Sequence, residues 1–316
     1  MSPAAPTEPP ASPTPDNTRR NVQSAEHYAE LQRAGLANPD AFWRAAAKQL
    51  YFESPLPDAG NLLNFNFNSD NGAPFVSFVE GAKTNVCYNC IDRFMLDRDG
   101  PDVEGVRVPK RNFNYKFYWE GNYWDEPTHD YAELTWETFQ IVVKKCANIL
   151  KSKGVQRGDR VLLYLPMVFQ LPVAMLACAR IGAVHVNVPG GMSAEGLAQR
   201  VVLSGAELII TVDGFWRGTK LIKAKETVDR AIALCKERGH EVKLTLMISH
   251  LSPNPGTPPP EAHEQFIGRR PCYFLNAPFN PEQDEWWADN FCKASPVCDV
   301  EWMDAEDPLF ISLHQC

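Results

Sequence analysis

Residues 160–248 predict an α/β protein built on a parallel sheet with helices on both faces. Apolar strands and helices alternate three times in this stretch, and the strands are continuously apolar rather than alternating with polar residues. Continuous apolar strands are typical of a parallel sheet that is covered on both faces. Each connection is long enough to hold a helix, so we expect right-handed crossovers between the strands.

The elements of this sheet follow from hydrophobic spacing and from the residues that end each segment. The expected strands are residues 160–165, 184–188, 208–212 and 242–248, and the expected helices are 168–181, 193–203 and 227–238. A further helix begins after Thr135, which can cap it, and runs to residue 153, where Gly154 ends it. Residues 309–311 resemble the opening of one more core strand.

The flanking regions carry weaker signals. Asn38, Pro39 and Asp40 predict a capped start for a helix over 41–50. The other expected elements are a loop over 61–72, a short helix over 87–95, strands at 116–120 and 131–134 around a turn at 121–128, and a proline-rich loop over 251–281. Residues 1–16 contain six prolines and predict a disordered tail.

Length and composition suit a globular protein of about two domains. The chain has 316 residues, of which 44% are hydrophobic and 22% charged, and its net charge is −8. This acidic balance argues against a dedicated nucleic-acid binder, but it is compatible with a local basic pocket. The most apolar stretch, 162–179, is interrupted by Pro166, Gln170 and Pro172, so it predicts buried elements rather than a membrane span.

The nine cysteines favour a reducing compartment and mostly buried thiols, because their number is odd and several lie in apolar periodic segments. Cys87 and Cys90 form a C-x-x-C pair, but the sequence has no second pair at zinc-ligand spacing and no thioredoxin-like context. We interpret the pair as ordinary core or helix-start cysteines. No H-E-x-x-H or G-x-S-x-G pattern is present either, so we assign no metal ligand and no catalytic residue.

Two short segments at one edge of the expected sheet are candidates for binding an anion. Gly190 and Gly191 follow the second strand and open a helix, whose N-terminal amides can face an anion. Arg217 and Lys220 follow the third strand at the same edge and could hold a phosphate group. The ordinary alternatives are a tight strand-to-helix turn for the glycines and a solvated basic turn for the cations.

Longer runs of residues resemble the AMP-forming acetyl-CoA synthetases, members of the adenylate-forming enzyme superfamily. The matching runs are 40–43, 85–93, 117–122, 166–167, 174–185, 190–195, 217–220 and 304–311. They occur in the family's order over residues 24–311, and they look closer to the cytosolic animal-type enzyme than to the mitochondrial one. The resemblance implies the N-terminal part of the adenylate-forming fold, preceded by a smaller N-terminal module.

The resemblance also implies a function, that of an acetate–CoA ligase. Such an enzyme converts acetate and ATP, with Mg²⁺, to acetyl-adenylate and pyrophosphate, and CoA then yields acetyl-CoA and AMP. Family contacts to CoA carry over onto Gly190, Gly191, Arg217 and Lys220. The family usually has aromatic residues around the paired glycines, where this chain has Pro189 and Met192. The implied partners are CoA and acetate, without nucleic acid or membrane, and the implied location is the cytosol, with the nucleus as a second site.

The resemblance further divides the chain into four parts. These are a proline-rich tail over 1–23, an acetyl-CoA synthetase N-terminal module over 24–95, a partial AMP-binding domain over 96–311, and an aberrant end over 312–316. The family continues after residue 311 with a loop that holds the ATP phosphates. We therefore expect a truncated, inactive ligase, and a one-nucleotide frameshift is our hypothesis for residues 312–316. The alternatives are a non-catalytic CoA-binding or interaction fragment, and a ligase for another short acyl chain such as propionate.

Overall fold

A computed structural model describes residues 22–57, 62–96, 116–123, 126–217, 220–251 and 275–313. Two compact units are present, one made of Met1–Leu50 with Asp58–Phe78 and the other of Tyr51–Pro57 with Val79–Cys316. The expected tail over 1–16 and most of the expected loop over 251–281 lie outside the described residues. None of the described helices is long and apolar enough to cross a membrane.

The first unit contains two helices and a hairpin. Its elements are α1 (Ala25–Ala37), α2 (Pro39–Ala47), β1 (Leu63–Asn66), the short helix η2 (Ser69–Asn71) and β2 (Phe75–Phe78). Asn38 caps α2 by accepting the amide of Ala41, as its sequence predicts. The expected loop over 61–72 is wrong in part, because β1 pairs antiparallel with β2. Its polar residues form the turn of this hairpin rather than the whole segment.

The second unit holds the sheet. Its remaining elements are β3 (Lys83–Thr84), η3 (Tyr88–Asp92), α3 (Arg93–Leu96), β4 (Lys116–Tyr123), β5 (Glu126–Thr135), α4 (Trp136–Ser152), β6 (Arg160–Leu165), α5 (Gln170–Arg180), β7 (Val184–Pro189), α6 (Ala194–Ser204), β8 (Leu208–Val212), β9 (Phe215–Arg217), β10 (Lys220–Ile222), α7 (Ala224–Glu237), β11 (Leu244–Ile248), β12 (Asp284–Trp286), α8 (Trp287–Lys293), β13 (Met303–Asp304) and β14 (Phe310–Ile311). The turn expected at 121–128 is shorter than predicted, because β4 and β5 extend into it.

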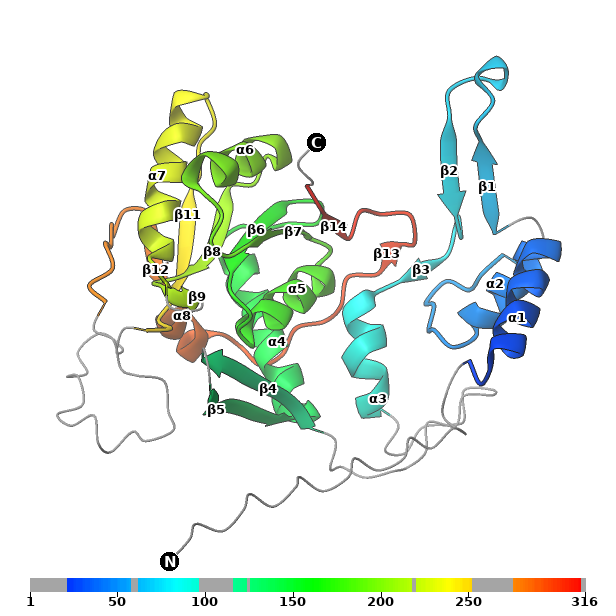
Figure 1. The fold of residues 1–316 in the computed structure, drawn as a ribbon, viewed down its shortest axis with the longest axis horizontal. Coiled ribbons are helices and arrows are strands. Elements are labelled where there is room, and N and C mark those ends of the chain that lie inside the picture. The colour runs from blue at the N-terminus through cyan, green and yellow to red at the C-terminus, as the bar shows by residue number, and fades with distance from the viewer. Residues whose placement is uncertain are drawn as a thin grey trace, which may run out of the picture. The chain divides into compact units, whose positions relative to one another are not determined.

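The main sheet confirms the predicted α/β class. Its six strands are ordered β12-β11-β8-β6-β7-β14, and all neighbouring pairs are parallel. Helix α4 packs against α5, and α6 packs against α7, in two separate groups (Figure 1). Right-handed crossovers place these groups on opposite faces, because the chain moves from β6 to β7 and then reverses to β8. The central strands are buried along nearly their whole length.

This topology has a switch point at the carboxyl end of β6. The connection after β6 enters α5 on one face, whereas the connections after β7 and β8 lead to α6 and α7 on the other. In open α/β sheets, ligands bind where neighbouring connections diverge in this way. The segments that follow β7 and β8 are therefore the first candidates for a ligand site.

Burial of His185 predicts that the stability of this sheet depends on pH. His185 is 4% exposed, and its ring stacks on Phe310. Its Nδ1 atom lies 3.2 Å from Oδ1 of Asn187. Burial lowers the pKa of His185 below its ordinary value of 6.5. The unfolded chain therefore takes up a proton before the folded chain does, and stability is lost as the pH falls from 6.5 toward the folded pKa.

We expect His185→Gln to remove this acid-sensitive contribution. In urea unfolding between about pH 8 and pH 5, the parent should lose up to about 1.4 kcal/mol per pH unit relative to the variant. Carboxylates elsewhere titrate in both proteins, so their contributions cancel in the difference between the two unfolding free energies. Parallel pH profiles for parent and variant would contradict the expectation.

Candidate functional site

The turn after β7 requires glycine at two positions, one for its backbone conformation and one for lack of space. Gly191 has a φ of +89°, a conformation that residues with a Cβ rarely adopt. The backbone of Gly190 lies close to the Phe215 ring, since a Cβ on this residue would lie 2.7 Å from it. Phe215 is buried in β9, so the turn and the segment after β8 are packed against each other.

The cations predicted from sequence lie on a small hairpin rather than a simple turn. Strands β9 and β10 pair antiparallel, and Arg217 is opposite Lys220 in their register. Arg217 also reaches the glycine turn, because a Cβ on Gly191 would lie 3.1 Å from its Nη1 atom. The structure thus brings Gly190, Gly191, Arg217 and Lys220 to one place beyond the carboxyl ends of β7 and β8.

Both cations are available to a ligand. Arg217 and Lys220 are exposed, and within the described ranges neither forms an ion pair with a carboxylate. An unpaired guanidinium offers a planar fork of donors, and an ammonium adds a compact charge, so the pair suits a phosphate group.

The base of the hairpin is closed by Asp213, which sequence reasoning missed. Its buried carboxylate accepts the amides of Gly214, His250 and Leu251 at 2.8–3.1 Å. Its backbone donates to Ile248 and accepts from Lys225. Asp213 therefore contacts both ends of the segment that carries Arg217 and Lys220, through Gly214 at its start and Lys225 at its end.

The N-terminus of α6 offers fewer free amides to an anion than the sequence predicts. The amide of Gly191 donates to the Tyr164 hydroxyl at 3.1 Å, and the amide of Gly196 donates to Ser193 Oγ at 3.2 Å. Glu195 adds a carboxylate in the first turn of α6, and hydrogen bonds to its own backbone amide and to Ser193 lower its pKa. Donors already used inside the protein cannot bind a ligand, so the attraction for an anion rests mainly on the two cations.

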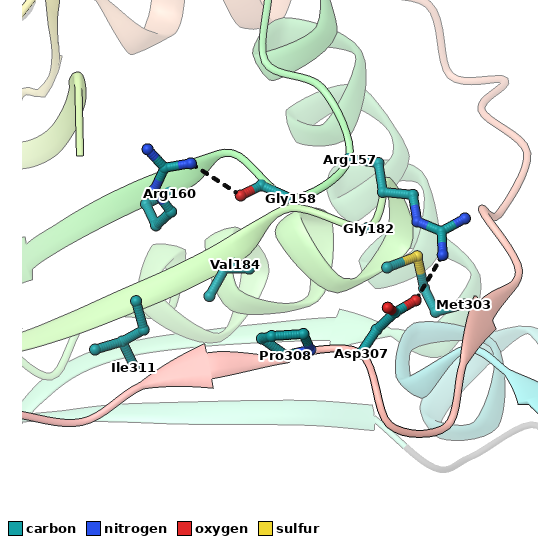
Figure 2. Close-up of a pocket in the computed structure, with 9 residues that line it drawn as sticks. All are labelled: Arg157, Gly158, Arg160, Gly182, Val184, Met303, Asp307, Pro308 and Ile311. Carbon is teal, nitrogen blue, oxygen red and sulfur yellow. Dashed lines mark hydrogen bonds and ion pairs between the residues drawn. The ribbon is translucent and has the colours of Figure 1, made fainter. Parts of the chain in front are cut away.

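A small cavity lies at the opposite, amino edge of the sheet (Figure 2). Its volume is about 200 Å³, and it is lined by Arg157, Gly158, Arg160, Gly182, Val184, Met303, Asp307, Pro308 and Ile311. Its arginines already have partners: Arg157 pairs with Asp307 at 2.6 Å, and Arg160 donates to backbone carbonyls including that of Gly158. The carboxyl edge, where the cations are free within the described residues, is the better candidate site.

In the described part of the chain, the cysteine pair lies beside a buried ion pair rather than in a cluster of metal ligands. Cys87 is buried beside Arg180 and Asp92, and burial raises its pKa to about 12. Cys90 is exposed, and neither thiol is in a disulfide. Across the described ranges, no group of three or more His, Cys, Asp and Glu side chains could hold a metal ion.

The fold and the carboxyl-edge residues define a class, the open α/β proteins whose ligand crevice lies beyond the strand ends. Within that class, the chain belongs to the family of AMP-binding enzymes, whose model matches residues 117–312. A second model, the acetyl-coenzyme A synthetase N-terminus, matches residues 28–90. The resemblance recognised in the sequence is therefore confirmed.

Curated relatives and a solved structure agree with this assignment. An acetyl-coenzyme A synthetase from Drosophila melanogaster is 38% identical over 92% of this chain and 39% of its own length. A chloroplastic/glyoxysomal acetyl-coenzyme A synthetase from Arabidopsis thaliana is 34% identical over 92% of this chain and 34% of its own length. An acetoacetyl-CoA synthetase from Streptomyces lividans has the same fold, with a TM-score of 0.63 at 20% identity, over 90% of this chain and 35% of that one. The chain thus spans less than half the length of these relatives.

Proposed function

We propose that this chain carries the CoA-binding edge of an acetate–CoA ligase, which forms acetyl-CoA, AMP and pyrophosphate from acetate, ATP and CoA. The observation that carries the proposal is the convergence of Gly190, Gly191, Arg217 and Lys220 at one edge of the sheet. The acetyl-coenzyme A synthetase relatives and the matching N-terminal model support the choice of substrate.

The chemistry of this edge suits the phosphate groups of CoA. Two exposed cations are opposite each other on a hairpin, and a charge-assisted hydrogen bond to phosphate is about twice as strong as a neutral one. The two glycines beside them carry no side chain of their own, and Arg217 lies against Gly191. ATP and Mg²⁺ enter the proposal through the family alone, and we assign no residue of this chain to them.

The proposal includes a domain division and a location. We assign 24–95 to the N-terminal module and 96–311 to part of the AMP-binding domain, with 1–23 and 312–316 outside both. The division rests on the resemblance found in the sequence. The same resemblance to the cytosolic animal-type enzymes supports a cytosolic location, and the nucleus as a second site stays a prediction.

We expect the purified 316-residue chain to bind CoA, and Arg217→Ala to weaken that binding roughly ten- to hundredfold. The reason is the loss of a charge-assisted hydrogen bond, which is worth about 1.5–3 kcal/mol. Isothermal titration calorimetry measures the affinity directly. Arg157→Ala is the matched control, since it removes an arginine at the opposite edge and should leave CoA binding unchanged.

Pantetheine, which lacks the phosphates, should bind parent and Arg217→Ala alike. Loss of affinity for both ligands in Arg217→Ala, or equal losses in the two arginine variants, would remove Arg217 from the proposed site. The absence of any CoA binding by the parent chain would overturn the proposal itself.

A non-catalytic CoA-binding protein is the second candidate, because the four assigned residues all concern CoA. Incubation of the chain with acetate, ATP, Mg²⁺ and CoA tests the second candidate in one direction. Formation of acetyl-CoA would exclude a non-catalytic protein and would contradict the expected inactivity of this chain, whereas CoA binding without turnover fits both a truncated ligase and the second candidate. Comparison of acetate with propionate in the same assay tests the remaining alternative, a different acyl chain.

A further inference from the structure

The hydroxyl of Tyr164 closes the glycine turn. Tyr164 is the penultimate residue of β6 and is fully buried. Its oxygen accepts the amide of Gly191 at 3.1 Å and donates to the carbonyl of Met192 at 3.0 Å. Since β6 and β7 are neighbours in the sheet, one phenolic oxygen links the end of the central strand to the turn that follows the next strand.

Both hydrogen bonds require a protonated phenol. Burial raises the pKa of Tyr164 above its ordinary value of 10, although the Gly191 amide, Thr227 and Arg230 act in the opposite direction. The hydroxyl therefore keeps its proton throughout the physiological range. A neutral hydroxyl can donate to one backbone group while it accepts from another, which is the arrangement seen here.

The turn held by Tyr164 supports Arg217 on its other side. A Cβ on Gly191 would lie 3.1 Å from Nη1 of Arg217 and 3.6 Å from its Cδ, so the arginine lies on the bare face of this glycine. Gly190 packs against Phe215, which is two residues before Arg217 on β9. A shift of the turn would therefore move both the surface under Arg217 and the strand that carries it.

We infer that Tyr164 is a positioning residue for Arg217, and that its hydroxyl sets the glycine turn against which the guanidinium is held. The inference rests on the proposed function only where it names CoA as the ligand. Tyr164→Phe removes the hydroxyl and keeps the ring, so it leaves the core packing of β6 in place. Ser204→Ala is the matched control, because it also removes a buried hydroxyl, at the C-terminal end of α6, whereas the turn precedes the N-terminal end of that helix.

Hydrogen–deuterium exchange of the full chain tests the inference without any ligand. We expect Tyr164→Phe to raise exchange about two- to tenfold in peptides covering 188–193 and 213–223, and Ser204→Ala to leave both unchanged. A faster exchange of the glycine turn alone, with the hairpin peptide unaffected, would overturn the link to Arg217. Unchanged exchange in both peptides would overturn the role of the hydroxyl.

Titration with CoA supplies a second, independent measurement. Tyr164→Phe should weaken CoA about two- to tenfold and leave pantetheine unchanged, and its effect should shrink in an Arg217→Ala background because the two residues act through one contact. Additive losses, or equal losses for CoA and pantetheine, would show a general structural role and contradict the inference. If the parent binds no CoA, the proposed function fails, and the exchange experiment still decides the inference.

Discussion

Replacing Asp92 with alanine is expected to destabilise the folded chain by about 3–5 kcal/mol. Asp92 forms a two-pronged ion pair with Arg180, at 2.7 and 3.1 Å, and the Arg180 side chain is 3% exposed. Removing the carboxylate leaves a buried guanidinium without its counter-charge. The free energy of unfolding falls because the folded state then holds a charge that is removed from water and has no counter-charge.

The pair joins segments that are far apart in sequence. Asp92 also accepts from Gln140 on α4 at 2.8 Å, and Arg180 donates to the carbonyl of Cys298 at 2.7 Å. Asn85, near Asp92 in the chain, donates to the carbonyls of Ala179 and Glu301. This polar cluster connects η3 and its flanking residues to α4, α5 and the segment before β13, so its loss should be felt across the second unit.

Urea unfolding measures the expected loss, and two further variants test its cause. Glu207→Gln removes the charge from an exposed ion pair with Lys243 and should change stability little, because water screens surface pairs. The double variant Asp92→Leu with Arg180→Met removes both buried charges and should recover much of the loss. If the double variant is less stable than Asp92→Ala, the pair contributes more than compensation of a buried charge, and the explanation is wrong.

The sheet could be predicted from sequence because its strands are long, apolar and buried. The expected strands 160–165 and 208–212 coincide with β6 and β8 residue for residue. Periodicity also placed α4 between its Thr135 cap and Gly154. By contrast, β1 was missed because its residues alternate with asparagine and it forms only by pairing with β2. Short strands depend on a partner whose position the local sequence does not contain.

The four candidate CoA residues were found because glycines and cations are visible as residue types. The residues that hold them in place were not. Tyr164 reads as one apolar member of a buried strand, and its role depends on a turn that begins about 27 residues later in the chain. Asp213 reads as an ordinary acidic residue after a strand, and only the structure shows that it also accepts amides from the two residues His250 and Leu251 that follow β11. Supporting contacts of this kind are tertiary, so residue spacing cannot reveal them.

Lys225→Met is expected to destabilise the chain by about 3–5 kcal/mol near neutral pH. The Lys225 side chain is 2% exposed, and its Nζ lies 2.5 Å from Asp229 and 2.8 Å from Asp284. The Asp284 side chain is 1% exposed, so loss of the ammonium leaves a buried carboxylate close to a second one. Methionine fills the space of the lysine stem but supplies no charge and no donor.

The pH dependence of this loss identifies its cause. Burial already raises the pKa of Asp229 with Lys225 present, and the charge of Asp284 acts in the same direction. Without Lys225 the folded state should hold a proton on Asp229 to a higher pH than the unfolded chain does, which stabilises the variant as the pH falls. Urea unfolding should therefore show the deficit of Lys225→Met shrinking toward acid, and Asp284→Asn in the same background should restore stability at neutral pH. A deficit that is constant with pH and unrelieved by Asp284→Asn would mean that lost packing around the start of α7, rather than buried charge, is the source.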